Sequence, residues 1–183
     1  GPGLTFDTNS NTLYGSLGTL SRIDTTTGRP TAVGALGFSS VSALAFDSDR
    51  SILCGVDDGP ETFITINTAT GAGTYVGPLG PFFQFDEIEG LAFDPDSATL
   101  YGTNVDPDEL ITIDTLTGEA TVVGALAFTV FGLALDPNTS TLYGADIVTD
   151  QLITINSTTG NGTVIGPLGF ANVQGLAFDP NTN

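Results

Sequence analysis

A twelve-residue phrase recurs along the chain and constrains its fold more than any other feature. The clearest copy, Leu91–Gly102, reads Leu-Ala-Phe-Asp-Pro-Asp-Ser-Ala-Thr-Leu-Tyr-Gly. Copies begin at Leu4, Leu44, Leu91 and Leu133, and the first part of a fifth copy begins at Leu176. The starts are 40, 47, 42 and 43 residues apart. A repeat of this length indicates an architecture in which each unit buries its apolar surface against its neighbours.

Each repeat contains four short segments with the pattern of β-strands. Leu-Ala-Phe alternates up to an Asp, and Thr-Leu-Tyr-Gly follows after a polar turn. A third alternating segment, such as Leu110–Asp114, leads into Thr-x-Thr-Gly, whose Gly118 suits a tight hairpin. The fourth segment is Thr121–Gly124 in the same copy. No stretch has the 3.6-residue period of a helix, so the sequence predicts an all-β protein built from the four-stranded antiparallel blades of a β-propeller.

The predicted domain organisation is a single β-propeller over residues 1–183. Its blades span approximately 4–43, 44–90, 91–132 and 133–175, and an extra strand covers 176–183. Four copies fit a closed four-blade ring. However, the extra strand (Leu176, Ala177, Phe178) and Leu4–Asp7 both have the pattern of a first strand, and they cannot occupy the same place. The extra strand therefore belongs to a larger ring, or it pairs with a neighbouring chain in an eight-blade ring or a fibre.

Several motifs together carry a resemblance that covers essentially the whole chain. They are Phe-Asp-Pro, Thr-Leu-Tyr-Gly, Leu-Ile-Thr-Ile-Asp, Thr-x-Thr-Gly and Thr-Val-Val-Gly. In this combination they resemble the blades of bacterial secreted or surface β-propeller repeats of the NHL and YVTN types. The resemblance implies the fold and the turns, and it implies little about function.

The charge of the chain limits its partners. It has 3 Lys and Arg residues, 21 Asp and Glu residues and no His, for a net charge of -18. Such a surface repels phosphate backbones and anionic lipids, so we expect no nucleic acid binding and no membrane insertion. A strongly acidic, well-solvated surface suits a secreted or cell-surface protein. The expected partners are further copies of the chain, an extracellular protein or a glycan.

Acidic residues occur at two kinds of position in the repeat. One Asp ends the first strand of every copy, and we expect it to accept backbone hydrogen bonds within its own turn. The loops that follow the second strand, and the linkers between repeats, lie on the opposite face of a propeller and differ between copies. The candidate calcium ligands there are Asp57, Asp58, Asp86, Glu87, Asp106 and Asp108. The candidate binding rim adds Phe82, Phe83, Phe85, Glu89, Asp146 and Asp150.

Two interpretations of this acidic rim stay open from the sequence. Carboxylates that converge could bind Ca²⁺, which prefers oxygen ligands, and the Phe residues could anchor a partner. Alternatively, the acids are solvated loop residues and the Phe side chains fill the core.

Catalysis finds little support in the sequence. The chain lacks His and Lys, and its single Cys54 takes the place that Tyr has in the other copies, which indicates a small buried side chain. We therefore predict no catalytic residues and no required cofactor, with Ca²⁺ as the one candidate. The predicted function is a non-enzymatic extracellular structural or assembly module that self-associates through the extra strand. The alternative is a binding module that uses the acidic rim, and a hydrolase using carboxylates or calcium is less favoured.

Overall fold

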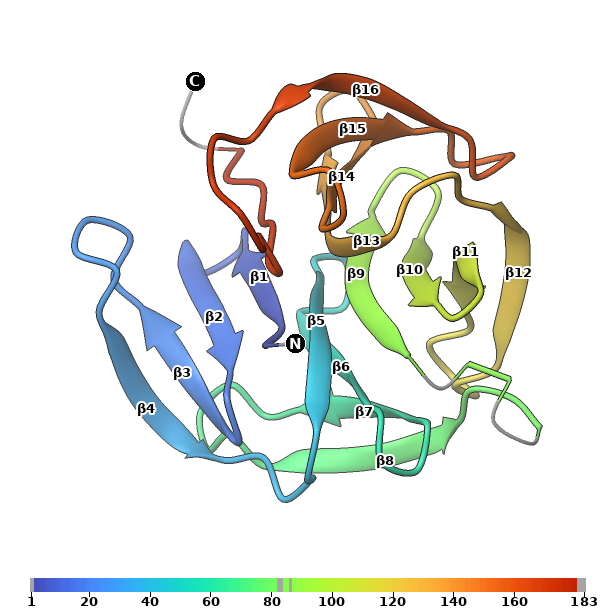
Figure 1. The fold of residues 1–183 in the computed structure, drawn as a ribbon. Coiled ribbons are helices and arrows are strands. Elements are labelled where there is room, and N and C mark those ends of the chain that lie inside the picture. The colour runs from blue at the N-terminus through green and yellow to red at the C-terminus, as the bar shows by residue number, and fades with distance from the viewer. Residues whose placement is uncertain (1, 82–83, 86, 181–183) are drawn as a thin grey trace.

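The structure of the chain is a computed structural model that describes residues 2–81, 84–85 and 87–180. Within these residues, sixteen strands form four antiparallel sheets of four strands each, and the order of strands within each sheet follows the chain. The sheets surround a common axis as the four blades of a β-propeller (Figure 1). The fold class predicted from the repeats is therefore confirmed.

Each blade begins with an inner strand near the axis and ends with an outer strand. Blade 1 contains β1 (Leu4–Asp7), β2 (Thr12–Ser16), β3 (Thr19–Ile23) and β4 (Pro30–Ala35). Blade 2 contains β5 (Val41–Asp47), β6 (Ile52–Asp57), β7 (Thr62–Ile66) and β8 (Gly73–Pro78). Blade 3 contains β9 (Ile88–Asp94), β10 (Thr99–Val105), β11 (Asp108–Ile113) and β12 (Ala120–Ala125). Blade 4 contains β13 (Val130–Asp136), β14 (Thr141–Asp146), β15 (Gln151–Ile155) and β16 (Gly162–Pro167).

The pairing register repeats from blade to blade. In blade 3, Leu91 pairs with Gly102 and Phe93 pairs with Leu100. The third and fourth strands of every blade shift register at the same place, which is Leu110/Ile111 in blade 3. A shift of this kind bends and twists a sheet. All four sheets therefore share one local shape, which lets similar faces pack against one another around the ring.

The turns are held by the residues that the sequence pattern singles out. Asp7 Oδ1 accepts hydrogen bonds from the backbone N–H groups of Asn9 and Ser10, at 2.9 and 3.0 Å. Asp114 Oδ1 accepts the N–H groups of Leu116 and Thr117 at 2.8 and 3.0 Å. The glycine of each Thr-x-Thr-Gly turn has φ between 70° and 83°, a region that residues with a β-carbon rarely adopt. The predicted scaffolding role of the turn residues is confirmed.

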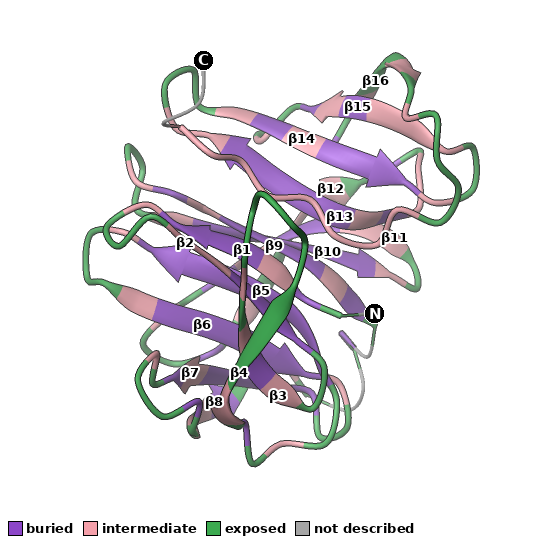
Figure 2. Ribbon diagram, turned by 90° about the vertical axis from the view of Figure 1, so that its left-hand side faces the viewer, coloured by how far each residue is buried: buried purple, intermediate pink, exposed green. Residues whose placement is uncertain are grey.

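The hydrophobic core lies between the blades rather than within any one of them. Leu20 of blade 1 packs in one cluster with Ile64 of blade 2, and Phe63 of blade 2 packs in another with Ile111 of blade 3. A third cluster joins blades 3 and 4. Figure 2 shows that β4, an outer strand, is largely exposed. Since a fully buried Leu, Ile or Phe contributes about 1.5–3 kcal/mol, the boundaries between blades supply most of the hydrophobic stabilisation.

Cys54 lies in the cluster between blades 2 and 3 and is 2% exposed. Burial raises the pKa of its thiol to about 12. The structure thus confirms the expectation of a small buried side chain at this position. In the described part of the chain, no helix has the length and apolar character needed to cross a membrane.

Candidate functional site

The C-terminal segment, residues 172–180, occupies a fifth inner position in the ring (Figure 1). It lies between β13 and β1, as two close approaches of glycine backbones show. A β-carbon at Gly132 would lie 3.0 Å from the backbone nitrogen of Leu176, and one at Gly175 would lie 3.0 Å from Leu4 Cβ. Gly3 and Gly90 approach the inner strand of their following blade in the same way. The axis is therefore surrounded by five inner positions, although the described residues form only four blades.

The predicted extra strand lies in this fifth position but does not form a strand ladder. Leu176, Ala177 and Phe178 are only partly buried, and no ladder in the described residues includes them. The ring is therefore not closed by four blades alone, which corrects the simplest of the sequence-based alternatives. The segment completes the inner ring of its own chain, and its outward edge has no second strand beside it among the described residues.

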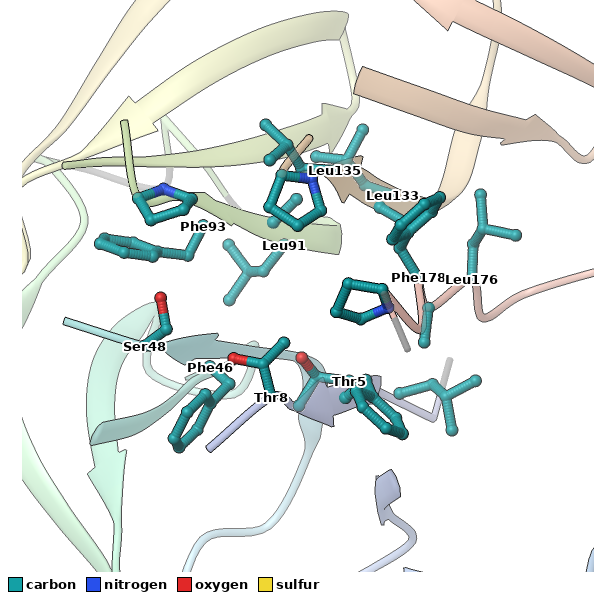
Figure 3. A pocket seen from close by; sticks show the side chains of 18 of the residues that line it. Thr5, Thr8, Phe46, Ser48, Leu91, Phe93, Leu133, Leu135, Leu176 and Phe178 are labelled. Atoms are coloured by element: carbon teal, nitrogen blue, oxygen red, sulfur yellow. The ribbon is translucent and has the colours of Figure 1, made fainter. Parts of the chain in front are cut away.

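The five inner positions enclose a cavity of about 390 Å³ (Figure 3). Its walls come from equivalent residues of the repeat, with Leu91, Phe93 and Pro95 in blade 3 and Leu176, Phe178 and Pro180 in the fifth position. Polar side chains such as Thr8, Asn9 and Ser48 surround its opening. The cavity is therefore a mainly apolar funnel that opens on the face of the Asp turns.

Blade 4 presents an uncovered face on the side where the outer strands of a fifth blade would lie. We call this empty space between blades 4 and 1 the gap. Ile165 of β16 is 53% exposed, whereas its equivalents Val33, Val76 and Val123 pack into the clusters between blades. Phe170 in the following linker is 77% exposed, whereas Phe38 and Phe128 pack. We call Tyr143, Leu152, Ile165 and Phe170 the open flank of blade 4.

Blade 1 presents the complementary uncovered face on the other side of the gap. Leu13 and Ile23 are only partly buried, although their equivalents Leu53 and Ile66 are buried against blade 1. We call Leu4, Leu13 and Ile23 the open flank of blade 1. The two open flanks are thus the apolar halves of boundaries whose other halves are missing from the described residues.

A backbone contact that marks every internal boundary is absent at the gap. A β-carbon at Gly77 would overlap the carbonyl oxygen of Thr117 in the turn of blade 3, and Gly34 and Gly124 meet the next blade in the same manner. The equivalent glycine of blade 4, Gly166, has no atom within 4 Å of such a β-carbon. Gly28, in the equivalent turn of blade 1, is likewise open.

The candidate calcium ligands that the structure describes do not converge on one point. Asp57 is buried, and its Oδ1 accepts the backbone N–H of Ser40 at 2.7 Å. Asp108 Oδ2 lies 3.3 Å from the hydroxyl of Thr129, while Asp106 and Glu87 are exposed. Within the described ranges, no three Asp, Glu or Cys side chains gather closely enough to hold a metal ion. Asp86 lies outside the described residues.

Asp58 has an unusual environment within this rim. Burial, reinforced by the negative charges of Glu89 and Asp57, raises the pKa of Asp58 to about 7. Ser42 Oγ lies 2.8 Å from Asp58 Oδ1 and 2.6 Å from the carbonyl oxygen of Ile88. Burial favours the neutral carboxylic acid, whereas the hydrogen bond that Ser42 donates to Asp58 opposes this shift by stabilising the carboxylate.

The remaining rim candidates have mainly structural positions. Phe85 is 2% exposed in the cluster between blades 2 and 3, so it cannot act as the surface anchor that was one interpretation of the sequence. Asp146 is buried and accepts the N–H of Thr129 at 3.2 Å as well as the hydroxyl of Thr149. Asp150 Oδ1 accepts the N–H of Asn172 at 3.0 Å, which holds the start of the C-terminal segment. Glu89 lines a second, much smaller hollow, which Leu91 and Leu176 also line. Phe82 and Phe83 lie outside the described residues.

The sequence reasoning missed the two open flanks and the central cavity. The signal for the cavity was present, because the same Leu-x-Phe-x-Pro positions recur in the inner strands. The signal for the flanks was not in the residue types, since Ile165 follows the same pattern as Val76. It lay in the number of first-strand copies, which exceeds the number of complete repeats by one.

Comparisons with known proteins give similarity of fold only. No family model and no curated protein matches the sequence. A structure of a nidogen/laminin complex is similar over 97% of this chain and 68% of its own, with 18% identity and a TM-score of 0.71. A gluconolactonase from Xanthomonas campestris is similar over 92% of this chain and 62% of its own, with 14% identity and a TM-score of 0.64.

A protein of unknown function from Bacteroides thetaiotaomicron is similar over 84% of this chain and 40% of its own, with 20% identity and a TM-score of 0.63. The chain therefore spans 40% to 68% of the length of these structures. Sequence identities this low carry no information about activity. The comparisons support the resemblance to β-propeller repeats as a resemblance of fold, and a bacterial surface-repeat family is not shown by them.

Proposed function

We propose that this chain is a non-enzymatic structural module whose fifth blade position takes up β-strands from outside residues 1–183. The observation that carries the proposal is the mismatch between five inner positions and four blades. An inner segment without a neighbouring strand exposes backbone groups that readily accept an added strand. The two open flanks would gain apolar burial from the same event.

The composition and the acidic rim support a role without catalysis. The chain has no His or Lys, and its buried rim acids hold backbone N–H groups in place. No cofactor is needed for the proposed assembly. The nidogen/laminin complex shows a similar fold in a structure of two associated proteins, which supports protein binding as a use of such a fold. The net charge of -18 supports a location outside the cell and argues against nucleic acid as a partner.

Strand addition can be tested with the full chain and a short peptide. The peptide Thr99–Asn104 carries the second-strand sequence of blade 3, which pairs with Leu91–Asp94 in the ring. We expect it to pair with Leu176–Phe178 and to shift the amide NMR signals of these residues in a saturable manner. Light scattering over a wide range of protein concentration measures whether a second copy can supply the strand instead.

Two variants distinguish binding at this site from non-specific association. Ile165→Asp places a charge on the open flank of blade 4, and Val164→Asp places one on the neighbouring side chain, which is 47% exposed. Only the first should weaken peptide binding or self-association. A chain that stays monomeric at all concentrations and shows no peptide-induced shifts at Leu176–Phe178 would refute the proposed function.

A further inference from the structure

The internal boundaries show which parts a partner needs in order to fill the fifth position. At the boundary between blades 2 and 3, the second and third strands of blade 3 supply Leu100, Ile111 and Ile113 to the shared cluster. The Thr-x-Thr-Gly turn of blade 3 supplies the backbone that meets Gly77. These parts belong to strands two, three and four of a blade. The inner strand alone, which the fifth position already has, supplies none of them.

The open flanks match such a three-stranded sheet on both of its faces. The face that carries Leu100, Ile111 and Ile113 would cover Ile165 and Leu152, as it covers their equivalents Val76 and Phe63 within the chain. The opposite face, with Tyr101, Leu110 and Val123, packs in the chain against the inner side of blade 4. In the fifth position it would meet the equivalent residues Leu4, Leu13 and Ile23 of blade 1.

The backbone of the gap fits the same partner. Gly166 is open at the place where Gly34, Gly77 and Gly124 each receive the turn of a following blade. Leu176–Phe178 has the residue pattern of Leu91–Phe93, which pairs with β10 through Leu91 and Gly102. One rigid sheet can therefore satisfy the inner edge, both flanks and the glycine contact together.

A second intact copy cannot supply this sheet without a loss elsewhere. Residues 1–183 contain four sets of outer strands for five inner positions, so an exchange between two copies would leave one position empty for each one filled. The occupant therefore lies outside residues 1–183.

We infer that the fifth position binds a three-stranded antiparallel sheet with the sequence pattern of this repeat, which comes from outside residues 1–183. Its second-strand equivalent pairs with Leu176–Phe178, and its Thr-x-Thr-Gly turn lies on Gly166. This inference rests on the proposed function, which requires only that the site accept a strand. It adds the number of strands, the turn and the register.

The test uses the full chain and the peptide Thr99–Ala125, which contains β10, β11 and β12 and five acidic residues that favour its solubility. Titration calorimetry in about 0.3 M salt, where charge repulsion is screened, measures binding. We expect one peptide per chain, with an affinity at least about tenfold higher than that of Thr99–Asn104, because both flanks become covered. Peptide carrying Ile111→Asp should lose this gain.

Gly166→Ala tests the docking of the turn without disturbing the chain, since its β-carbon meets no atom within 4 Å. It should weaken binding of Thr99–Ala125 at least about tenfold and leave binding of Thr99–Asn104 unchanged. Val164→Asp should change neither. Equal affinities of the two peptides, or an unaltered affinity in Gly166→Ala, would overturn this inference while leaving strand addition in place. Failure of both peptides would instead refute the proposed function.

Discussion

The four equivalent glycines at the ends of the outer strands allow one substitution to be compared in two settings. A β-carbon at Gly77 would overlap the carbonyl oxygen of Thr117 and lie 3.0 Å from its carbonyl carbon. Both atoms belong to a backbone turn that cannot rotate away like a side chain. The turn of blade 3 would have to retreat by roughly 1 Å, which also loosens the packing of the neighbouring Val76. At Gly166 the same β-carbon enters open space.

The expected free energies of unfolding follow from this geometry. Gly77→Ala should destabilise the chain by about 3 kcal/mol, at the upper end of the usual cost of overpacking a core. Gly166→Ala should change stability by less than about 1 kcal/mol, with stabilisation favoured because alanine loses less backbone entropy than glycine. For a domain of this size, 3 kcal/mol corresponds to a fall in Tm of roughly 6–12 °C.

Urea unfolding followed by circular dichroism measures both variants, with Gly34→Ala and Gly124→Ala as repeats of the crowded case. The three crowded variants should all unfold at lower urea concentrations than the wild type, and Gly166→Ala should not. If Gly77→Ala and Gly166→Ala unfold at the same urea concentration, the close contact between blades is not present in solution and the reasoning fails.

Three further predictions concern single residues. The pKa of Asp58 is raised, so its stabilising contribution is complete below about pH 4 and is lost as the pH rises through about 7. Asp58→Asn should remove this loss, which we set at about 2 kcal/mol because the carboxyl group is partly exposed. Equal pH dependence of wild type and variant in urea unfolding between about pH 4 and about pH 7, which are roughly the limits of the expected change, would contradict it. Ala98 has a φ of 51°, so Ala98→Gly should stabilise the fold by about 0.5–1 kcal/mol. As a control, Ala32→Gly in β4 should destabilise the fold by a similar amount. A loss of stability in Ala98→Gly would show that the backbone strain is absent. Cys54 should react with a thiol reagent at a negligible rate in the native chain and fully in denaturant, and rapid native labelling would show that the boundary between blades 2 and 3 opens readily.

The local features of the fold were predictable because they depend on neighbouring residues in the sequence. The alternation in Leu110–Asp114 predicts a strand, and β11 covers Asp108–Ile113. Asp114 and Gly118 predict the turn that follows, and both have the expected roles. Blade boundaries follow from the period of the repeat for the same reason.

The candidate site was less predictable because it depends on contacts between distant segments. Asp57 looks like a surface ligand in the sequence, yet its carboxylate accepts the backbone N–H of Ser40, in the linker between blades 1 and 2. Phe85 belongs to a long insertion that appears variable and exposed, yet its ring enters the core. Ile165 and Val76 are alike in sequence, and only the presence or absence of a following blade gives them different exposure.

The uneven covering of the blades also has a consequence for how the molecule unfolds. Blades 2 and 3 each share a cluster with a blade on both sides, whereas blades 1 and 4 each share only one. In a repeat array, stability is approximately a sum over the units and their nearest-neighbour contacts, so a ring that lacks one link behaves as an open array with two ends. Local opening therefore begins at blades 1 and 4, and amide hydrogens in β15 exchange through smaller fluctuations than those in β7. An occupant of the fifth position would remove both ends at once, turning a gradient of protection into a single cooperative unit.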